Sequence, residues 1–274
     1  MHLITGATGN VGRHIVEGLL AAGAGVRASS RNPATAELPA GVDIVASQTD
    51  SPAFAGVVGA FLNPAAVHDT ADRLLAQASA AGVRRIVLLS SSSVLDDHPD
   101  NHTGIAHRDL EQRIERSGLE WTFLRAGMFA ANTRQWAARI RADHIIHAAY
   151  TSAAIAPIHE RDLAAAAVRA LLTDDLLHQS PVLTGPELIT QADQAKLIGD
   201  IIGKPVRLEE TDARTAREHM IAQRMPPEIA DSLLRYYERA ITQPIEPTPI
   251  STDLTRQQPR TYRQWVLEHA ADFR

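Results

Sequence analysis

The sequence predicts an α/β fold with a doubly wound parallel sheet, because short apolar strands alternate with amphipathic helices along the chain. The expected strand 83–89 ends in the continuous apolar run IVLL, which is typical of a parallel strand buried on both faces. The first twelve residues, MHLITGATGNVG, read as a strand and a glycine-rich turn, and a helical apolar pattern follows. This order is typical of dinucleotide-binding domains. We therefore expect a Rossmann-type sheet followed by a smaller C-terminal α+β substrate lobe.

Composition narrows the class of protein. The chain has 274 residues, 45% of them apolar, which is enough for one large domain or for a domain with a smaller lobe. A net charge of -5 without a basic tail argues against nucleic-acid binding. There is no cysteine, no apolar run of membrane-spanning length, and no room for a signal peptide before the first strand. We expect a cytoplasmic protein with a small-molecule substrate and no membrane partner; a homodimer is compatible with the sequence.

Three glycines of the first turn have separate expected roles. Gly6 lets the chain turn sharply off the strand, and Gly9 lets a pyrophosphate approach the backbone. Gly12 lets the helix pack close to the strand. The backbone N–H groups of the first helical turn would face the anion, helped by the helix dipole. The residues expected to hold the cofactor here are Thr5, Gly6, Ala7, Thr8, Gly9, Asn10, Val11 and Gly12.

The second strand, 26–29, predicts the choice of cofactor. No acidic residue that could bind the ribose 2′-hydroxyl occurs between Glu17 and Glu37. The strand instead runs into Ser30 and Arg31, and a guanidinium matches a 2′-phosphate in bidentate fashion. We expect NADP(H) rather than NAD(H). The alternative is that Arg31 is a solvated charge, or that it stacks on adenine without selecting between NADP(H) and NAD(H).

The remaining elements are placed by their apolar spacing and by glycine and proline. Further strands are expected at 42–46, 57–62, 121–125, 145–150, 182–184 and 206–209. Helices are expected at 69–80, 103–117, 129–141, 163–172, 190–202, 212–224, 227–241 and 261–271. Segment 49–55 is too short for a crossover helix, and Pro244, Pro247 and Pro249 form a stiff connector. The dinucleotide-binding domain is expected to span 1–150, and the substrate lobe, partly interleaved with it, 151–274.

Polar residues follow two of the buried strands. Carboxyl ends of parallel strands face the ligand in a doubly wound sheet. Asn63 and Pro64 after strand 57–62, and Ser90 and Ser91 after strand 83–89, are therefore expected to flank the cofactor, with Ser90 near the nicotinamide. For the first pair an ordinary turn is an equal alternative.

The sequence lacks the residue pair that is usual in enzymatic carbonyl reduction. A Tyr-x-x-x-Lys pair donates a proton to the carbonyl oxygen. None of Tyr150, Tyr236, Tyr237 and Tyr262 has a lysine four residues on, and no lysine precedes Lys196.

His107 is the replacement candidate. It shares a helix face with Leu110 near the start of helix 103–117, and an imidazole there could donate a proton to a reduced substrate. A core histidine paired with a carbonyl, or one that orients the cofactor, is an equal alternative. Glu111, one turn on, is expected to be solvated rather than to orient this histidine.

Other polar and aromatic side chains have weaker assignments. Phe129, Asn132 and Trp136 are candidates to line the substrate pocket, although core packing explains them as well. Loop 95–107 holds three aspartates and three histidines without the fixed spacing of a metal site. We expect no metal, and expect the loop to cover the substrate.

Five stretches together resemble the NmrA-like group of atypical short-chain dehydrogenases/reductases. They are TGATGNVG at 5–12, SRNP at 30–33, RIVLLSS at 85–91, SGLEWTFLR at 117–125 and PIHERDLA at 157–164. The resemblance implies a Rossmann-type domain, a smaller C-terminal substrate lobe and usually NADP(H). It also implies that His107 falls where some members carry a functional lysine. Ala126 stands where the family usually has proline, which loosens the turn beside the nicotinamide.

The predicted activity follows from the missing tyrosine–lysine pair. The group that the chain resembles includes NADPH-dependent quinone and benzylic-ether-type reductases, and also redox-sensing regulators that bind a dinucleotide. Hydride transfer to a quinone, enone or imine needs mostly positioning, whereas a plain ketone needs a strong proton donor. We expect an NADPH-dependent oxidoreductase acting on a small conjugated acceptor. A non-catalytic NADP(H) sensor and a non-redox biosynthetic enzyme are the alternatives.

Overall fold

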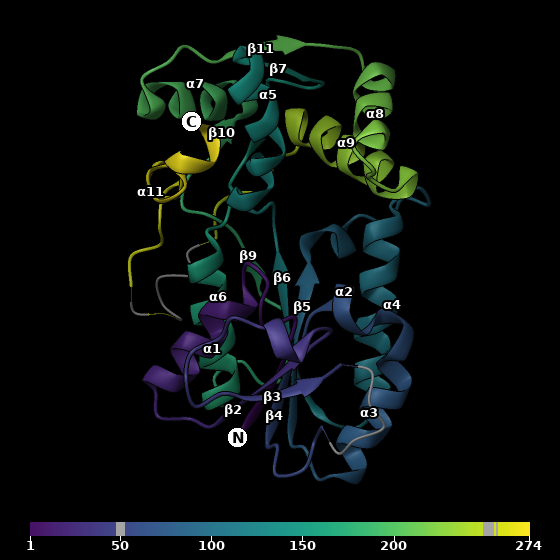
Figure 1. Ribbon diagram of the computed structural model, residues 1–274. Helices are drawn as coiled ribbons and strands as arrows, with labels where there is room; N and C mark the ends of the chain where they lie inside the picture. Colours follow the sequence, from purple (N-terminus) through teal and green to yellow (C-terminus); the bar gives the residue numbers. More distant parts are fainter. Residues whose placement is uncertain (48–52, 249–254, 256) are drawn as a thin grey trace.

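A seven-stranded parallel sheet forms the centre of the molecule (Figure 1). The computed structural model describes residues 1–47, 53–248, 255 and 257–274. The strand order is β3-β2-β1-β4-β5-β6-β9. The strands are β1 (His2–Thr5), β2 (Val26–Ser30), β3 (Asp43–Ala46), β4 (Gly59–Leu62), β5 (Arg85–Ser91), β6 (Glu120–Ala126) and β9 (Val182–Leu183). The reversal of order at β1, where the chain crosses to β4, confirms the predicted doubly wound Rossmann-type sheet.

Helices cover both faces of this sheet. α1 (Gly12–Ala21) and α6 (Glu160–Leu172) pack against each other on one face. On the other face lie α2 (Pro64–Val67), α3 (Ala71–Ala80) and α4 (His102–Arg116). Successive strand residues point to opposite faces, so Ile4 joins the core under α1 and α6 whereas Leu3 joins the core under α3 and α4. No described helix has the length and apolar character needed to cross a membrane.

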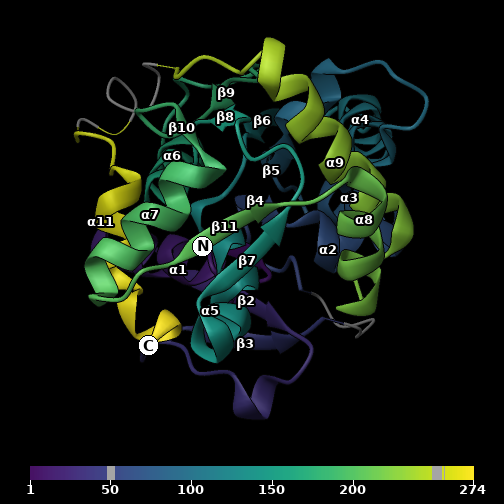
Figure 2. The same cartoon turned by 90° about the horizontal axis from the view of Figure 1, so that it is seen from above.

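A second layer of elements lies beyond the carboxyl edge of the sheet (Figure 1). Among the described residues it contains two small strand pairs, parallel β7·β11 and antiparallel β8·β10, and five α-helices. From above, α7 and α11 lie on one side of the β7·β11 pair and α8 and α9 on the other (Figure 2). The elements are α5 (Ala137–Asp143), β7 (Ile145–Ala148), β8 (Ala154–Ile155), β10 (Ile189–Thr190), α7 (Gln191–Ile202), β11 (Arg207–Glu210), α8 (Ala213–Ala222), α9 (Pro227–Thr242) and α11 (Tyr262–Glu268).

The two expected parts of the chain are interleaved. α6 and β9 come after residue 150, yet α6 packs on the sheet and β9 pairs with β6 as its seventh strand. The chain thus returns to the sheet before it builds α7, α8 and α9. The division at residue 150 stays a prediction from the sequence.

Two predicted elements differ from the structure. The helix expected at 129–141 is wrong as a single helix: Ala130–Trp136 is a 3₁₀ segment, and α5 begins only at Ala137. The strand expected at 83–89 runs from Arg85 to Ser91, so Ser90 and Ser91 belong to the strand rather than follow it. The short connection 49–55 and Pro249 lie wholly or partly outside the described residues.

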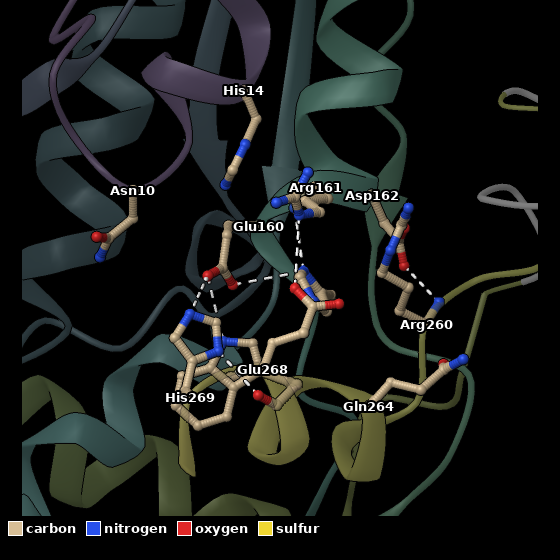
Figure 3. Close-up of polar contacts among 12 residues, drawn as sticks. Asn10, His14, Glu160, Arg161, Asp162, Arg260, Gln264, Glu268 and His269 are labelled. Carbon is tan, nitrogen blue, oxygen red and sulfur yellow. Dashed lines mark hydrogen bonds and ion pairs between the residues drawn. The ribbon is translucent and has the colours of Figure 1, made fainter. Parts of the chain in front are cut away.

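Charged pairs join the start of α6 to the C-terminal segment (Figure 3). Asp162 accepts hydrogen bonds from the Arg260 backbone N–H and guanidinium. Glu160 Oε1 accepts from Trp265 Nε1 at 3.2 Å and lies 3.4 Å from His269 Nε2. The N-cap of α6 is His159, whose Nδ1 accepts the Arg161 backbone N–H at 3.2 Å, and Asp162 lies in the first turn.

We predict that Gly12→Ala lowers the free energy of unfolding by about 3 kcal/mol or more. An added Cβ would lie 2.2 Å from the Gly6 carbonyl oxygen and 2.8 Å from Ala7 Cα, and both atoms are backbone. Thermal and urea unfolding would measure the loss. Gly127→Ala is the control, since its added Cβ would find its nearest neighbour at 3.5 Å. Equal stability of the two variants would contradict the close approach of α1 to the turn.

We predict that His159 makes the protein less stable in mild acid. Burial lowers the pKa of His159 to about 3, and its Nδ1 lone pair is already used in capping α6. Below the ordinary histidine pKa of about 6.5, the unfolded chain binds a proton that the folded chain does not. The free energy of unfolding should therefore fall as pH drops from 6.5 towards 3, by about 2 kcal/mol between pH 7 and pH 5.

His159→Asn tests this assignment, because asparagine also accepts at a helix N-cap but does not titrate. Urea unfolding at pH 7 and pH 5 should show a smaller acid loss in the variant than in the wild type. The same loss in both proteins would mean that other groups cause the pH dependence.

Candidate functional site

The glycine turn after β1 forms a backbone cradle at the carboxyl edge of the sheet. The Gly9 N–H donates to the Gly6 carbonyl at 2.9 Å, and Gly6 has φ +64°, a conformation that side chains rarely adopt. A Cβ on Gly9 would lie 3.1 Å from the Gly6 oxygen. The side chains of Ala7 and Val11 point into the core, whereas Thr8, Gly9 and Asn10 are exposed. The turn therefore presents backbone and small polar groups outward, as a pyrophosphate requires.

Asn63 lies directly against this turn. A Cβ on Gly6 would come within 2.8 Å of Asn63 Nδ2. Thr5 Oγ1 donates to the Phe61 carbonyl and accepts from the Asn63 N–H at 2.8 Å, which ties the end of β1 to the end of β4. Pro64 follows as the first residue of α2. The structure thus brings Thr5, Gly6, Asn63 and Pro64 together, as the order of strands predicts.

A polar cavity of about 430 Å³ adjoins the turn at the end of β2. Ser30, Arg31 and Asn32 line one side of it, and Thr8 and Arg13 line the other. Arg13 donates to the Thr8 and Gly9 carbonyls at 3.2 and 3.3 Å, which holds its guanidinium beside the turn. Glu17 and Glu37 also line the cavity, and Glu17 is hydrogen-bonded to His14 Nδ1. Sequence reasoning missed Arg13, although its place directly after Gly12, in the first turn of α1, gave a local signal.

A second cavity, of about 390 Å³, lies where β5 and β6 end. Ser91 and Asn132, two of the predicted site residues, line it. Its remaining walls come from the start of α4, the turn after β6, and α9. The side chains that sequence reasoning missed here are Ser92, Ser93, Asn101, Thr103, Gln135, Met225, Ile229, Ser232, Leu233 and Tyr236. Nothing local in the sequence indicates that residues 225–236 join this wall, because more than 90 residues separate them from β6.

His107 does not line this second cavity among the described residues. It is half-buried on α4, and its Nδ1 lies 2.9 Å from the Thr103 carbonyl of the same helix. This contact matches the alternative of a histidine paired with a carbonyl. A proton-donating role for His107 stays a prediction.

Ser90 is part of a buried polar network. Its hydroxyl donates to Glu111 Oε1 at 2.6 Å, and Arg125 binds both oxygens of Glu111, at 3.0 and 2.7 Å. Glu111 is only 4% exposed, so the expectation of a solvated glutamate was wrong. The hydrogen bonds that Arg125 donates to Glu111 raise the pKa of the Arg125 guanidinium. This network fastens α4 to β5 and β6 beneath the second cavity.

Phe129 and Trp136 differ from Asn132 in their surroundings. Phe129 is half-buried and packs between two core clusters. Trp136 is 7% exposed and lines a different cavity, of about 280 Å³, between α5, β7, α8 and α9. Gln135 lines both cavities and so marks the wall between them. Of the three predicted substrate contacts, only Asn132 reaches the cavity at the ends of β5 and β6 among the residues described.

Two acidic residues of the loop before α4, Asp96 and Asp97, pair with arginines. Asp96 accepts two hydrogen bonds from Arg235 of α9, at 2.9 and 3.2 Å, and this contact lowers the pKa of its carboxyl. Asp97 pairs with Arg108 at 2.7 Å. Within the described ranges, no three His, Cys, Asp or Glu residues gather in a group that could hold a metal ion.

Comparisons with known proteins agree with this geometry. A family model described as NAD(P)H-binding matches residues 6–174. The chain is 35% identical to (4-alkanoyl-5-oxo-2,5-dihydrofuran-3-yl)methyl phosphate reductase of Streptomyces griseus, over 100% of this chain and 99% of that protein. It is 29% identical to NAD(P)H azoreductase of Xenophilus azovorans, with the same coverage.

Solved structures share the whole fold. A quinone oxidoreductase from Escherichia coli, in complex with NADPH, superposes with a TM-score of 0.83 at 23% identity and covers 98% of this chain and 99% of its own. The triphenylmethane reductase of Citrobacter gives a TM-score of 0.80 at 18% identity, over 98% of each chain. The chain belongs to the NAD(P)H-binding family, as its resemblance to the NmrA-like atypical short-chain dehydrogenases/reductases implied.

Proposed function

We propose that the protein is an NADPH-dependent oxidoreductase that transfers a hydride to a small conjugated acceptor of the quinone, enone or imine type. The observation that carries the proposal is one row of sites along the carboxyl edge of the sheet. A cavity with two arginines, the glycine cradle and the cavity at the ends of β5 and β6 lie along that edge. They would hold the adenosine phosphate, the pyrophosphate and the acceptor beside the nicotinamide, respectively. The cofactor supplies the hydride when bound.

The preference for NADPH rests on charge at the end of β2. An NAD(H) site places an acidic residue there for the ribose 2′-hydroxyl, and this chain has Ser30 and Arg31 instead. Arg13 adds a second guanidinium to the lining of the same cavity. Glu17 and Glu37 line it as well, and Glu17 is hydrogen-bonded to His14. We assign the 2′-phosphate to the two guanidinium groups, which match a dianionic phosphate better than a hydroxyl.

The choice of a conjugated acceptor rests on the cavity and on the relatives. Its walls are mixed, with Met128, Met225 and Leu233 facing hydroxyl and amide groups, which suits a flat molecule with polar edges. The name of the Streptomyces griseus relative describes a dihydrofuranone ring bearing an alkanoyl group, so that the ring double bond is conjugated with two carbonyls. The Xenophilus azovorans relative is named for azo compounds, which are also conjugated.

We predict that Arg31→Ala and Arg13→Ala each raise the KM for NADPH by about 10- to 100-fold, because each removes a charge-assisted hydrogen bond to phosphate. The KM for NADH should change by less than about threefold, because NADH has no 2′-phosphate. Steady-state kinetics with both cofactors would measure this. Arg84→Ala is the control, an exposed arginine before β5 that pairs with Glu120 and Asp174. Equal losses with NADPH and NADH would contradict the assignment of the cavity.

The reaction itself is tested with a panel of a quinone, an enone, an imine and a plain ketone. We expect NADPH oxidation, followed at the nicotinamide absorbance, with at least one of the three conjugated classes. Tight NADPH binding without oxidation would favour a sensor. Conversion of a substrate without consumption of cofactor would favour a non-redox enzyme.

A further inference from the structure

We propose that Tyr236 of α9 donates the proton to the acceptor oxygen in this reaction. The inference rests on the proposed function, since it concerns the same acceptor. The sequence contains no Tyr-x-x-x-Lys pair, so a phenol at this site is not expected from any motif. The fold nevertheless brings a phenol to the cavity. It belongs to α9, which begins at Pro227, far along the chain from the end of β6 at Ala126.

The position of Tyr236 carries the proposal. Its hydroxyl lies 4.0 Å from the point that a Cβ on Gly127 would occupy, directly after β6. Its side chain lines the cavity together with Ser91, Ser92 and Met128. Nicotinamide and substrate meet outside the carboxyl ends of the strands in doubly wound sheets. Tyr236 thus lies at the edge of the sheet where the acceptor would meet the nicotinamide.

The surroundings of the hydroxyl suit a proton donor. Burial raises the pKa of Tyr236 to about 12, so the phenol keeps its proton at neutral pH. The Met128 backbone amide, the Ser92 hydroxyl and the charge of Arg239 act in the opposite direction, because each favours the phenolate. Of the other charged groups on this wall, Asp96 is held by Arg235 and lies 4.0 Å from Arg239. The same groups that oppose the rise in pKa would stabilise the phenolate formed when the proton leaves.

The step balances with groups already assigned. A hydride, with its two electrons, forms a C–H bond at the electron-poor carbon of the acceptor, and the π pair moves onto the acceptor oxygen. The Tyr236 O–H bond breaks as its proton forms the O–H bond of the product. NADPH is oxidised to NADP⁺ and the acceptor is reduced. Tyr236 regains its proton from solvent. It also lines a second, smaller cavity of about 30 Å³ together with Arg239 and Gln243.

The neighbouring tyrosine provides a matched control. Tyr237 is 5% exposed and packs against Ile155 and Ala240 in a core cluster, and its ring stands at 83° to that of Tyr236. It lines the cavity under α8 rather than the cavity at the ends of β5 and β6. Tyr237→Phe therefore shows how much activity is lost when a buried phenol hydroxyl is removed from α9 outside the acceptor cavity.

The kinetic experiment compares Tyr236→Phe with Tyr237→Phe, using the full chain saturated with NADPH and the best quinone or enone of the panel. General acid catalysis contributes about 10²- to 10⁴-fold. We expect kcat to fall at least about 100-fold in Tyr236→Phe and less than about threefold in Tyr237→Phe. The Kd for NADPH should be the same in both.

A binding experiment supplies a readout that does not depend on turnover. 4-Nitrophenol carries its negative charge on an oxygen next to an aromatic ring, and so resembles the reduced acceptor before protonation. Titration calorimetry with the NADP⁺-saturated protein should show at least tenfold weaker 4-nitrophenol binding in Tyr236→Phe than in the wild type. Tyr237→Phe should bind it as the wild type does.

The outcomes separate the two proposals. A wild type that reduces the acceptor, with a Tyr236→Phe rate equal to it at every pH, overturns the role of Tyr236 and leaves the proposed function standing. A wild type that binds NADPH but reduces no acceptor overturns the proposed function, and with it proton donation by Tyr236. Equal 4-nitrophenol affinities in the wild type and Tyr236→Phe overturn the placement of this hydroxyl against the ligand.

Discussion

The contact between the start of α1 and the turn after β1 is the constraint on which the rest of the site depends. A single Cβ on Gly12 would overlap the Gly6 carbonyl, so this approach exists only because the residue has no side chain. The close approach leaves the exposed face of the turn lined by backbone and small polar groups. It also sets Asn63 of the neighbouring strand against the same turn. The shape of the cradle therefore follows from how the backbone of the turn packs against α1. The polar groups around the cradle are held in place by the neighbouring strands of the sheet.

A second constraint is electrostatic and acts between parts of the chain that are far apart in sequence. Glu111 is buried beneath the cavity at the ends of β5 and β6, and the half-buried Arg125 binds both of its carboxylate oxygens there. Asp96 and Arg235 join the loop before α4 to α9, and Asp162 and Arg260 join α6 to the C-terminal segment. Each pair crosses between elements that form separate layers. The first pair holds α4 against β6, and the other two hold α9 and the C-terminal segment over the sheet, so that together they support the walls of the cavity.

The wrong expectations came from side chains whose partners are distant. Glu111 reads as a solvated helix residue, because its helix gives no indication that Ser90 and Arg125 lie opposite it. The helix expected at 129–141 has suitable apolar spacing, yet its first turns are 3₁₀, and the strand-like contact of Phe129 with Ile158 precedes them. The spacing of apolar residues shows only which secondary structure a segment prefers on its own. Tertiary contacts override this preference where both ends of the segment are held.

The sequence alone determined the α/β class, the order of most strands and helices, the dinucleotide-binding turn and the residues at the ends of β2 and β4. These features follow from glycine spacing and apolar period, which act over a few residues. Only the tertiary structure decided which side chains line the cavity at the ends of β5 and β6. It set His107 outside the lining of that cavity, buried Ser90 against Glu111, turned Trp136 to another cavity and brought Tyr236 to the end of β6. Those positions depend on how α4 and α9 pack across the sheet edge, and no short stretch of the chain encodes that packing.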